Sequence, residues 1–564
     1  MWVGPDPARD RLAQHLAQAT GHGPLLCQLL ARADVDAGEV DAYLNPKLRD
    51  LMPDPSHLLD MDRAVACFLA HVRAGHRIAI FADYDVDGAA SAALLHEWLG
   101  KVGLAPTLYV PDRLDEGYGP NVPAMERLAA EHKLILCVDC GTLAHGPIAA
   151  ARAAGAEVIV LDHHTGGETL PEAPVVNPNR QDETSAHGML CAAGVVFLFL
   201  AAANREQRRA GARCPDLMEM LDLVALATVA DVAPLKGLNR ALVRQGLTVA
   251  ASRRRPGLAA LADVASLSTA PTPYHLGFVL GPRINAGGRV GRADLGARLL
   301  TADRASAPGL AAELDQLNTA RRAIEASVRE EAIAQAEARG TDGPLVWAAG
   351  ADWHPGVVGI VAARLKEAFN RPAVVIGFQG SVGAGSARSV TGIDLGAAIA
   401  ACVAEGALPK GGGHKMAAGL TVTRDGLEAA MARLGAHLAR QGAQHRGAAD
   451  LTLEGVLAAG GATVDLIETL ERAGPFGAGA PQPRFAMPDM RVASARVVGA
   501  GHLQLRLKDA TGSLDAIAFD AAQGPLAALA AGDGHAWHIA GRLECDDWGG
   551  RRRAKLRIED AAPA

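Results

Sequence analysis

A short apolar run that ends in three carboxylates constrains this chain more than any other feature. Residues 77–82 are predicted to form a buried strand, because a short apolar run bounded by polar residues suits a sheet covered on both faces. Asp83, Asp85 and Asp87 then lie at the carboxyl end of a strand, where open α/β sheets bind ligands. Three carboxylates within five residues repel one another unless they are protonated or neutralised by cations. A divalent metal is therefore the most economical explanation.

Two plainer interpretations of this stretch stay open. The pattern of alternate acids followed by Gly88 matches the start of a calcium-binding EF-hand loop, but the twelfth position is Leu94 instead of a bidentate Glu. A strand also precedes it where a helix should stand. Alternatively, the acids form a solvated turn that caps the following helix, because Asp near a helix start is favourable on its own. The residues at the ends of the other predicted strands are needed to choose among a metal site, an EF-hand loop and a capping turn.

The region from residue 77 to residue 161 alternates between predicted strands and predicted helices. The strands cover residues 77–82, 107–110, 134–138 and 157–161, and the helices cover residues 89–100, 122–131 and 146–154. This alternation predicts a parallel, doubly wound sheet, in which the strand ends share one crevice and form a site. The polar residues at those ends are, in chain order, Asp83, Asp85, Asp87, Asp112, Arg113, Asp139, Asp162, His163 and His164.

These side chains indicate a particular chemistry. Carboxylate and imidazole groups together suit manganese, zinc or iron better than calcium, and carboxylates shared between two ions about 3.5–4 Å apart are typical of two-metal phosphoester hydrolysis. Asp231 follows an amphipathic helix predicted over residues 217–230 and is a candidate further ligand, although by periodicity alone it would be a surface residue. Cys137 and Cys140 could form a redox pair, but nothing else in the chain supports redox chemistry.

The remaining chain predicts three further parts. A long helical connector, roughly residues 239–339, is interrupted by the glycine-rich stretch 281–292, where Arg283, Arg289 and Arg292 could hold phosphates or the chain could simply turn. A second α/β domain begins near residue 343, and its glycine-rich stretches 380–390 and 411–419 predict an anion pocket. Five short β-like runs after residue 490 then suggest a small barrel of the OB type.

The bulk properties of the 564 residues exclude some classes of protein. A net charge of −7 gives no global attraction to nucleic acid, so such binding needs local basic patches, for example Arg551–Arg557. The eight cysteines are scattered, and no second Cys-x-x-Cys or His pair completes a zinc site. The amino terminus lacks the basic and apolar regions of a signal peptide, and the longest uncharged run is too short for a membrane span. We therefore expect a cytoplasmic protein with reduced thiols and no membrane contact.

A set of short motifs occurs along the chain in a fixed order. They are Asp83-Tyr84-Asp85-Val86-Asp87-Gly88, Val138-Asp139-Cys140-Gly141, Asp162-His163-His164, Ala230-Asp231-Val232, Gly281-Pro282-Arg283-Ile284-Asn285, Trp353-His354-Pro355-Gly356 and Gly412-Gly413-His414. In order and spacing this set resembles the DHH phosphoesterase superfamily, and more closely its RecJ branch, the single-strand-specific 5′-to-3′ DNA exonucleases. Each motif alone is weak, whereas the ordered set is specific.

The resemblance implies an α/β fold of several parts. These are an N-terminal helical segment (residues 1–70), a doubly wound parallel-sheet DHH catalytic domain (71–236), a helical connector (237–340), a second α/β domain of the DHHA1 type (341–445) and a C-terminal OB-type β-barrel (446–564).

The resemblance also implies roles for individual residues. Two Mn²⁺ or Mg²⁺ ions would be held by Asp85, Asp87, Asp139, His163 and Asp231. His164 would contact the scissile phosphate, with Asp83 and Asp162 as orienting groups in the catalytic set. The substrate would be bound by Arg113, Tyr118, Asn285, Arg289, Ser386, Arg388 and His414.

The implied function is a metal-dependent 5′-to-3′ exonuclease that releases 5′-mononucleotides from single-stranded DNA in repair and recombination. Its partners would be single-stranded DNA, a single-strand-binding protein and a recombination helicase, and the chain would act as a monomer. A first alternative is a phosphodiesterase for short oligonucleotides or cyclic dinucleotides, as in smaller DHH relatives that lack the terminal barrel. A second is a non-catalytic DNA-binding scaffold, against which the intact ligand set argues.

Overall fold

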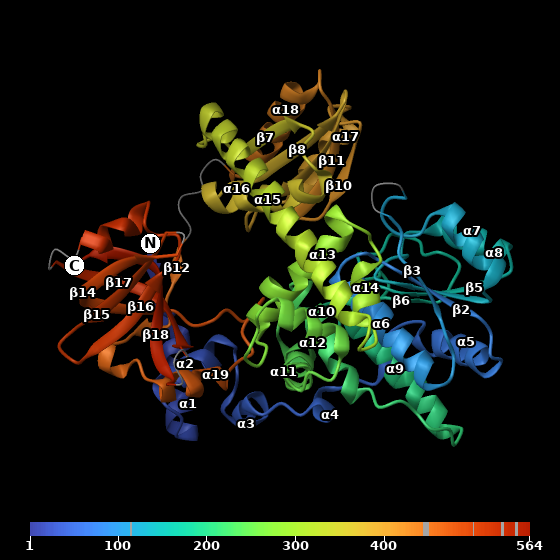
Figure 1. The fold of residues 1–564 in the computed structure, drawn as a ribbon, viewed down its shortest axis with the longest axis horizontal. Coiled ribbons are helices and arrows are strands. Elements are labelled where there is room, and N and C mark those ends of the chain that lie inside the picture. Colours follow the sequence, from blue (N-terminus) through green and yellow to red (C-terminus); the bar gives the residue numbers. More distant parts are fainter. Residues whose placement is uncertain (113–115, 444–449, 500, 532–534, 547–550) are drawn as a thin grey trace.

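The computed structural model describes residues 1–564 except 113–115, 444–449, 500, 532–534 and 547–550. The chain forms an α/β unit with a parallel sheet, a helical connector, a second α/β unit that follows a long helix, and a β-barrel (Figure 1). No helix within the described ranges has both the length and the apolar character required to cross a membrane.

The first sheet is parallel throughout, as predicted. Its strand order is β3-β2-β4-β5-β6, and four of its strands lie within a residue of the predicted bounds. The bounds are β2 (Ile78–Ala82), β3 (Thr107–Tyr109), β4 (Leu134–Val138), β5 (Glu157–Leu161) and β6 (Val175–Val176).

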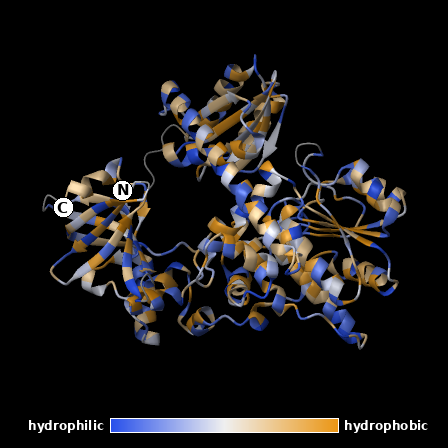
Figure 2. Ribbon diagram, viewed as in Figure 1, coloured by the Kyte–Doolittle hydropathy of each residue, from blue (hydrophilic) through white to orange (hydrophobic). Residues whose placement is uncertain are grey.

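Helices cover both faces of this sheet, which explains why its central strands are almost entirely apolar. Ile80, Leu136 and Ile159 point into a core shared with α5 (Met61–Arg73), α6 (Val86–Lys101) and α9 (Ala192–Arg209). Their neighbours Phe81, Ile135 and Val160 pack on the other face, against α7 (Val122–Glu131) and α8 (His145–Ala153). Accordingly, β2 and β4 are apolar and buried along their whole length, and β5 is apolar and buried after its first residue, the exposed Glu157 (Figure 2). The predicted doubly wound fold is confirmed.

The helices that follow differ from the prediction in two places. The helix predicted over residues 217–230 is not amphipathic: α10 (Leu221–Ala230) follows a 3₁₀ turn and is buried on every side over its first eight residues. Burial on all sides removes the polar face that periodicity analysis looks for.

The glycine-rich stretch near residue 281 is likewise not a break in the connector. It forms α13 (Gly281–Val290), directly after a π-helical turn at His275–Leu280. Its glycines allow close packing, since a Cβ on Gly288 would lie 2.8 Å from the ring of Tyr84. The other connector helices are α11 (Gly237–Ala251), α12 (Pro256–Val264), α14 (Leu295–Leu300) and α15 (Ala307–Arg339).

The second α/β unit has a mixed sheet of order β10-β11-β9-β8-β7, in which only β7 and β8 are parallel. Its glycine-rich stretches, from which an anion pocket is predicted, lie mostly in strands β9, β10 and β11. The elements are β7 (Val346–Ala351), α16 (Pro355–Phe369), β8 (Ala373–Gln379), β9 (Val382–Arg388), α17 (Leu395–Ala404), β10 (Lys410–Gly413), β11 (Ala417–Thr423) and α18 (Leu427–Arg440).

The C-terminal unit is a closed five-stranded barrel, as predicted for an OB fold. Strands β14-β15-β16-β18-β17 pair in that order, and β14 also pairs with β17 to close the barrel. The elements are β12 (Leu451–Thr452), β13 (Gly455–Val456), α19 (Val464–Glu471), β14 (Phe485–Val498), β15 (His502–Lys508), β16 (Ser513–Ala518), β17 (Ala536–Asp546) and β18 (Arg553–Pro563).

The first residues of the chain pack against this barrel. β1 (Trp2–Val3) pairs in parallel with β12, and Leu16, Leu30 and Leu44 lie in the same apolar cluster as the barrel interior. By contrast, Phe68 of α5 lies in the core of the first sheet. The N-terminal helices are α1 (Pro7–Thr20), α2 (Pro24–Arg32), α3 (Val40–Leu44) and α4 (Leu48–Leu51).

Candidate active site

Acidic and imidazole side chains converge at the carboxyl edge of the first sheet. His163, which follows β5, has its Nε2 atom 3.3 Å from Asp139 Oδ1 and 3.7 Å from Asp87 Oδ2. Its other ring nitrogen, Nδ1, lies 3.8 Å from Oδ2 of Asp231, the residue that ends α10. Four elements distant in sequence thus contribute to one cluster, as the strand-end argument predicted.

The start of α6 fixes two of these carboxylates. Asp85 is the N-cap residue, and its Oδ1 accepts hydrogen bonds from the backbone N–H groups of Asp87 and Gly88. Asp87 is almost fully buried, and its carboxylate accepts hydrogen bonds of 2.7 and 2.8 Å from Ala192 N and Ala193 N at the start of α9. Two helix N-termini therefore stabilise negative charge here.

Gly88 is required by a close backbone approach. A Cβ atom at this position would lie 2.4 Å from the carbonyl oxygen of Asp83, a distance that real Cβ contacts do not reach. Only glycine therefore lets α6 begin directly against the strand end that carries the acids.

Asp162 and His164 form a hydrogen-bonded pair. His164 Nδ1 lies 2.8 Å from Asp162 Oδ1, while Thr142 donates to Asp162 Oδ2 through both its backbone N–H and its hydroxyl. Burial alone would raise the pKa of Asp162, but the bonds from His164 and Thr142 lower it overall. Burial alone would lower the pKa of His164, whereas the hydrogen bond to Asp162 and its charge raise it to about 9. The pair fixes the orientation of the His164 ring.

Asp139 is buried among like charges, and one of its carboxylate oxygens has no hydrogen-bond donor among the described residues. It has a positive φ of 59°, is almost fully buried, and its Oδ1 accepts no hydrogen bond from any residue that the structure describes. Burial, and then the charges of Asp87, Asp85 and Asp83, raise its pKa well above the usual range. Burial and the same neighbours, Asp87 and Asp85, raise the pKa of Asp231 to about 8. Such uncompensated negative charge fits a site for cations.

The donor set suits divalent metal ions. Three overlapping groups of ligand atoms each lie within 4.8 Å of one another, and Asp139 and His163 each belong to two of them. The groups are Asp83, Asp85 and Asp139; Asp87, His163 and Asp231; and Asp139, His163 and His164. Oxygen and imidazole ligands of this kind suit Mn²⁺ and Mg²⁺, and shared ligands suit two adjacent ions.

Two predicted substrate residues touch this cluster. Tyr118 is 56% exposed, and its hydroxyl lies 3.2 Å from the carbonyl oxygen of Asp139 and 3.2 Å from His164 Nε2. Asn285 of α13 reaches the start of α6, where its Oδ1 accepts a hydrogen bond from Val86 N. Asn285 therefore ties the connector to the acidic strand end.

The other predicted substrate residues lie where the connector meets the second α/β unit. Arg289 of α13 donates to the carbonyl oxygen of Gly356 at the start of α16. Arg388 donates to Ser386 on β9, and a Cβ on Gly359 of α16 would touch both side chains. His414 is exposed at the turn between β10 and β11, and Arg113 lies outside the described residues.

Thr142 and Asn179 were missed by the sequence analysis, and Asn177 was assigned no role. Asn177 donates to Thr142 Oγ1 and to the carbonyl oxygen of His164, and Asn179 donates to the carbonyl oxygen of His163. Both asparagines follow β6, a strand of only two residues that the prediction omitted. The same strand-end argument, applied to Val175–Val176, would have found them.

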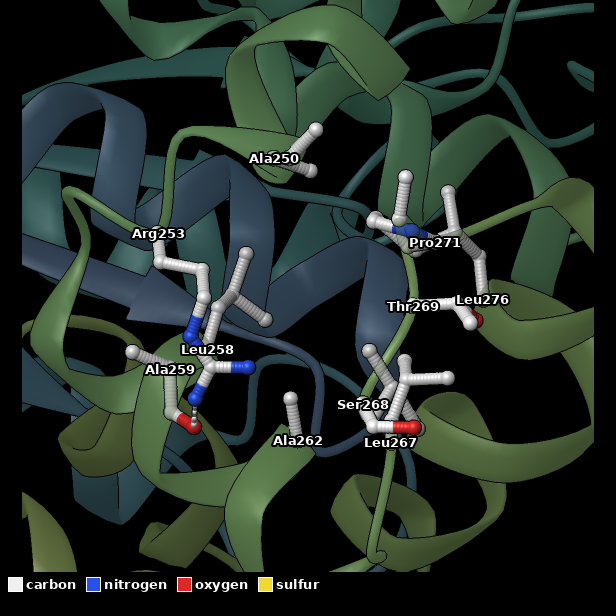
Figure 3. A pocket seen from close by; sticks show the side chains of 13 residues that line it. Ala250, Arg253, Leu258, Ala259, Ala262, Leu267, Ser268, Thr269, Pro271 and Leu276 are labelled. Atoms are coloured by element: carbon white, nitrogen blue, oxygen red, sulfur yellow. Dashed lines mark hydrogen bonds between the residues drawn. The ribbon is translucent and has the colours of Figure 1, made fainter. Parts of the chain in front are cut away.

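A separate cavity of 160 Å³ lies in the connector and shares no residue with the acidic cluster (Figure 3). Alanine and leucine side chains such as Ala262 and Leu258 dominate its lining, and the guanidinium of Arg253 is bound to Ala259 O and Asp263. It offers apolar volume without an evident reactive group.

Comparisons with known proteins agree with this geometry. Three family models match the chain: the DHH family N-terminal domain over residues 77–228, the DHHA1 domain over residues 342–439 and the RecJ OB domain over residues 453–560. The single-stranded-DNA-specific exonuclease RecJ of Dickeya dadantii is 36% identical over 545 residues, which cover 92% of this chain and 93% of the relative.

Solved structures show the same likeness. The crystal structure of RecJ from Thermus thermophilus in complex with Mn²⁺ matches with a TM-score of 0.82 and 31% identity, covering 100% of this chain and 79% of that one. The structure of the same protein in complex with Mg²⁺ matches with a TM-score of 0.76 and 29% identity, covering 100% and 78% of the two chains.

Proposed function

Because the chain belongs to the RecJ family of single-stranded-DNA-specific exonucleases, we propose that it hydrolyses the phosphodiester bonds of single-stranded DNA in the 5′-to-3′ direction. It would release 5′-mononucleotides during DNA repair and recombination. The observation that carries this proposal is the buried cluster in which Asp87 of α6, Asp139 after β4 and Asp231 at the end of α10 face the imidazole of His163 after β5.

Two Mn²⁺ or Mg²⁺ ions would be held in this cluster. When bound, they make a coordinated water acidic enough to attack at neutral pH and neutralise charge on the phosphate oxygens. The ligands would be Asp85, Asp87, Asp139, His163 and Asp231. Asp139 would be available as a ligand to both ions, because its Oδ1 accepts no hydrogen bond within the described chain and the residue belongs to two of the possible ligand groups.

His164 would contact the scissile phosphate. Its ring is held by Asp162, and Tyr118 lies against its other nitrogen, so the imidazole is oriented before substrate arrives. Such preorganisation lowers the cost of reaching the transition state. Asp83, buried directly after β2, would orient the neighbouring ligands through its carboxylate, of which one oxygen lies within 4.8 Å of carboxylate oxygens of Asp85 and Asp139.

The substrate would be held between the first sheet and the second α/β unit. Arg289, Ser386, Arg388 and His414 supply guanidinium, hydroxyl and imidazole groups suited to phosphates at the 5′ end, with Arg113 as a further predicted contact. Tyr118 would stack on a base, and Asn285 would position the start of α6. The closed OB barrel supports single-strand binding, because barrels of this type commonly hold single strands.

The finer features of this function are also proposals. We infer a monomer that acts in the cytoplasm, where reduced cysteines fit the eight free thiols of the structure. A single-strand-binding protein and a recombination helicase would supply its substrate, because a strand-specific exonuclease needs unwound DNA.

The test is digestion of a long single strand labelled at the 5′ or the 3′ end, with Mn²⁺ or with chelator, beside a blunt duplex and a dinucleotide. We expect early, Mn²⁺-dependent loss of the 5′ label and no digestion of the duplex. Loss of the 3′ label first would refute the polarity. Cleavage of the dinucleotide alone would show that the protein is a short-oligonucleotide phosphodiesterase instead.

A further inference from the structure

A second group of metal-ligating side chains lies at the opposite edge of the first sheet. Cys67 and His71 are four residues apart on α5, which places them on one face of the helix. Glu157 is the first residue of β5, whose other end leads to the catalytic histidines. One ligand atom from each of the three lies within 4.8 Å of the others.

The side chains of Cys67 and His71 both contact one carboxylate oxygen of Glu157. Cys67 Sγ lies 2.7 Å from Glu157 Oε2, and His71 Nε2 lies 3.3 Å from the same atom. Other thiols of the protein are farther from their partners: Cys140 Sγ and Cys214 Sγ each lie 3.3 Å from a carbonyl oxygen. Without a metal, both contacts to Glu157 need a proton on the sulfur or nitrogen, and a cation can replace those protons.

A fourth residue orients the imidazole. His76 Nδ1 lies 3.0 Å from His71 Nδ1, so a hydrogen bond between the rings requires a proton on one of these nitrogens. A proton on His71 Nδ1 leaves the lone pair of His71 Nε2 directed toward Cys67 and Glu157. Histidine ligands of metals are commonly held in this way by a second hydrogen-bonding group.

We propose that Cys67, His71 and Glu157 bind a zinc ion that ties α5 to the amino end of β5, with His76 as the residue that orients His71. This inference stands independently of the proposed exonuclease function. The site is placed to stabilise the catalytic domain, because it joins a strand of the first sheet to a helix that covers that sheet.

The donor set selects zinc over the metals of the catalytic cluster. A thiolate and an imidazole are ligands that Zn²⁺ prefers, whereas Mg²⁺ and Mn²⁺ favour carboxylates and water. The His71 side chain is only 12% exposed, while Glu157 is 64% exposed, so an ion can enter from solvent. Zinc would bind by displacing the thiol proton of Cys67, because the thiolate is the form that ligates a metal.

The two clusters are separate sites. β5 runs from Glu157 to Leu161, roughly 13 Å at about 3.3 Å per residue, and the catalytic cluster begins only after it. The catalytic groups contain carboxylates and imidazoles but no thiol. A thiolate ligand therefore distinguishes an ion bound at one edge from an ion bound at the other.

The test is titration of Co²⁺, a spectroscopic substitute for zinc, into the metal-free full chain in excess Mg²⁺, which occupies the catalytic carboxylates. We expect a sulfur-to-cobalt charge-transfer band that saturates at one equivalent and disappears when zinc is added. Cys67→Ser should abolish the band, whereas the matched control Cys214→Ser should keep it. No band in the unaltered chain, or an unchanged band in Cys67→Ser, would overturn the proposal.

Two further variants cover the case in which Cys67→Ser does not fold. Glu157→Gln alters an exposed side chain, and it should keep the band but weaken cobalt binding at least tenfold. His76→Ala should weaken binding by about 10- to 100-fold, as for other groups that orient a metal-bound histidine. Unchanged affinity in Glu157→Gln would show that the carboxylate is not a ligand and would contradict the site.

Discussion

Buried acids occur in two regions of the catalytic domain, and their surroundings differ. On α10, Asp222 lies against Arg255, whose Nε and Nη2 atoms donate to it at 2.7 and 3.1 Å, while Arg255 Nη1 lies 2.9 Å from Glu97. At the strand ends, the ion pairs of Asp139 and Asp87 among the described residues are with histidines alone. Among the described residues, the first region pairs its acids with a guanidinium that is permanently charged, whereas the second pairs Asp139 and Asp87 with imidazoles.

The pKa values follow this difference. Burial would raise the pKa of Glu97, but Arg255 and Lys101 lower it overall, so this carboxylate stays ionised. The pKa of Asp139 is raised instead, because burial and neighbouring carboxylates act in the same direction. The fold thus neutralises the acids that hold it together and leaves uncompensated the acids that we propose bind metal.

The largest effect is expected for Asp139→Asn. Loss of a shared ligand removes several kcal/mol of transition-state stabilisation, and each 1.36 kcal/mol is tenfold, so exonuclease activity should fall about 10⁴-fold. In chelator, thermal unfolding should occur at the same or a higher temperature than in the unaltered chain, because a buried repulsion is removed. Near-normal turnover would refute the metal assignment.

Asp222→Asn should have the opposite effect: it should lower the stability of the protein and leave its exonuclease activity unchanged. Breaking a buried ion pair leaves Arg255 undercompensated and should cost about 3 kcal/mol of stability. Urea denaturation monitored by the fluorescence of Trp98, which is buried in the same domain, measures this loss. Exonuclease turnover per folded molecule should stay unchanged, and a loss comparable to that of Asp139→Asn would erase the distinction between the two regions.

Gly88→Ala tests how closely the acids depend on backbone placement. The new Cβ would meet the carbonyl oxygen of Asp83 at 2.4 Å, so α6 must shift, and displacement of about 1 Å can cost about 100-fold in rate. Gly100→Ala on the same helix is the control, because nothing lies within 4 Å of its Cβ. That change should leave activity intact and stabilise the helix by about 0.5–1 kcal/mol. Equal exonuclease rates for Gly88→Ala and Gly100→Ala would show that the placement of the acids does not depend on the backbone contact at Gly88.

The smallest effect is expected for an exposed paired acid in the second α/β unit. Hydrogen bonds from Arg433 and His437 lower the pKa of Glu405 from 4.5 to about 2. A folded-state pKa below the unfolded one stabilises the protein above the unfolded pKa and loses that effect as pH falls through the folded value. The unfolding temperature of Glu405→Gln should therefore lie slightly below that of the unaltered chain near neutral pH. The difference in unfolding temperature should narrow as the pH falls from about 4.5 toward 2. A difference that does not change with pH would contradict the stabilising role of the Glu405 carboxylate.

The first sheet and its acids could be predicted because both depend on local pattern. β4 and β5 match their predicted bounds residue for residue, since short buried runs bounded by polar residues leave little ambiguity. The strand-end rule then gathered Asp83, Asp139 and Asp162 without knowledge of side-chain positions.

The features that the sequence did not predict depend on tertiary contacts. Glycines in α13 favoured an interruption, but the need to pack Gly288 against Tyr84 overrides their low helix propensity. Ser386 and Arg388 stay predicted substrate residues, but they lie within β9, so their position depends on strand register and not on a loop. The cluster of Cys67 and His71 with Glu157 was missed because its third ligand lies far along the chain and no spacing rule connects them.

The contact between the first residues and the barrel affects the order of folding during synthesis. The apolar side chains of α1 and α2 pack against partners from Ala459 onward, and Trp2 Nε1 donates to Asp560. At about 5–20 residues per second, roughly 20 to 80 s pass between the synthesis of these helices and that of their partners. The helices that leave the ribosome first must therefore wait for almost the whole chain before they can bury their apolar faces.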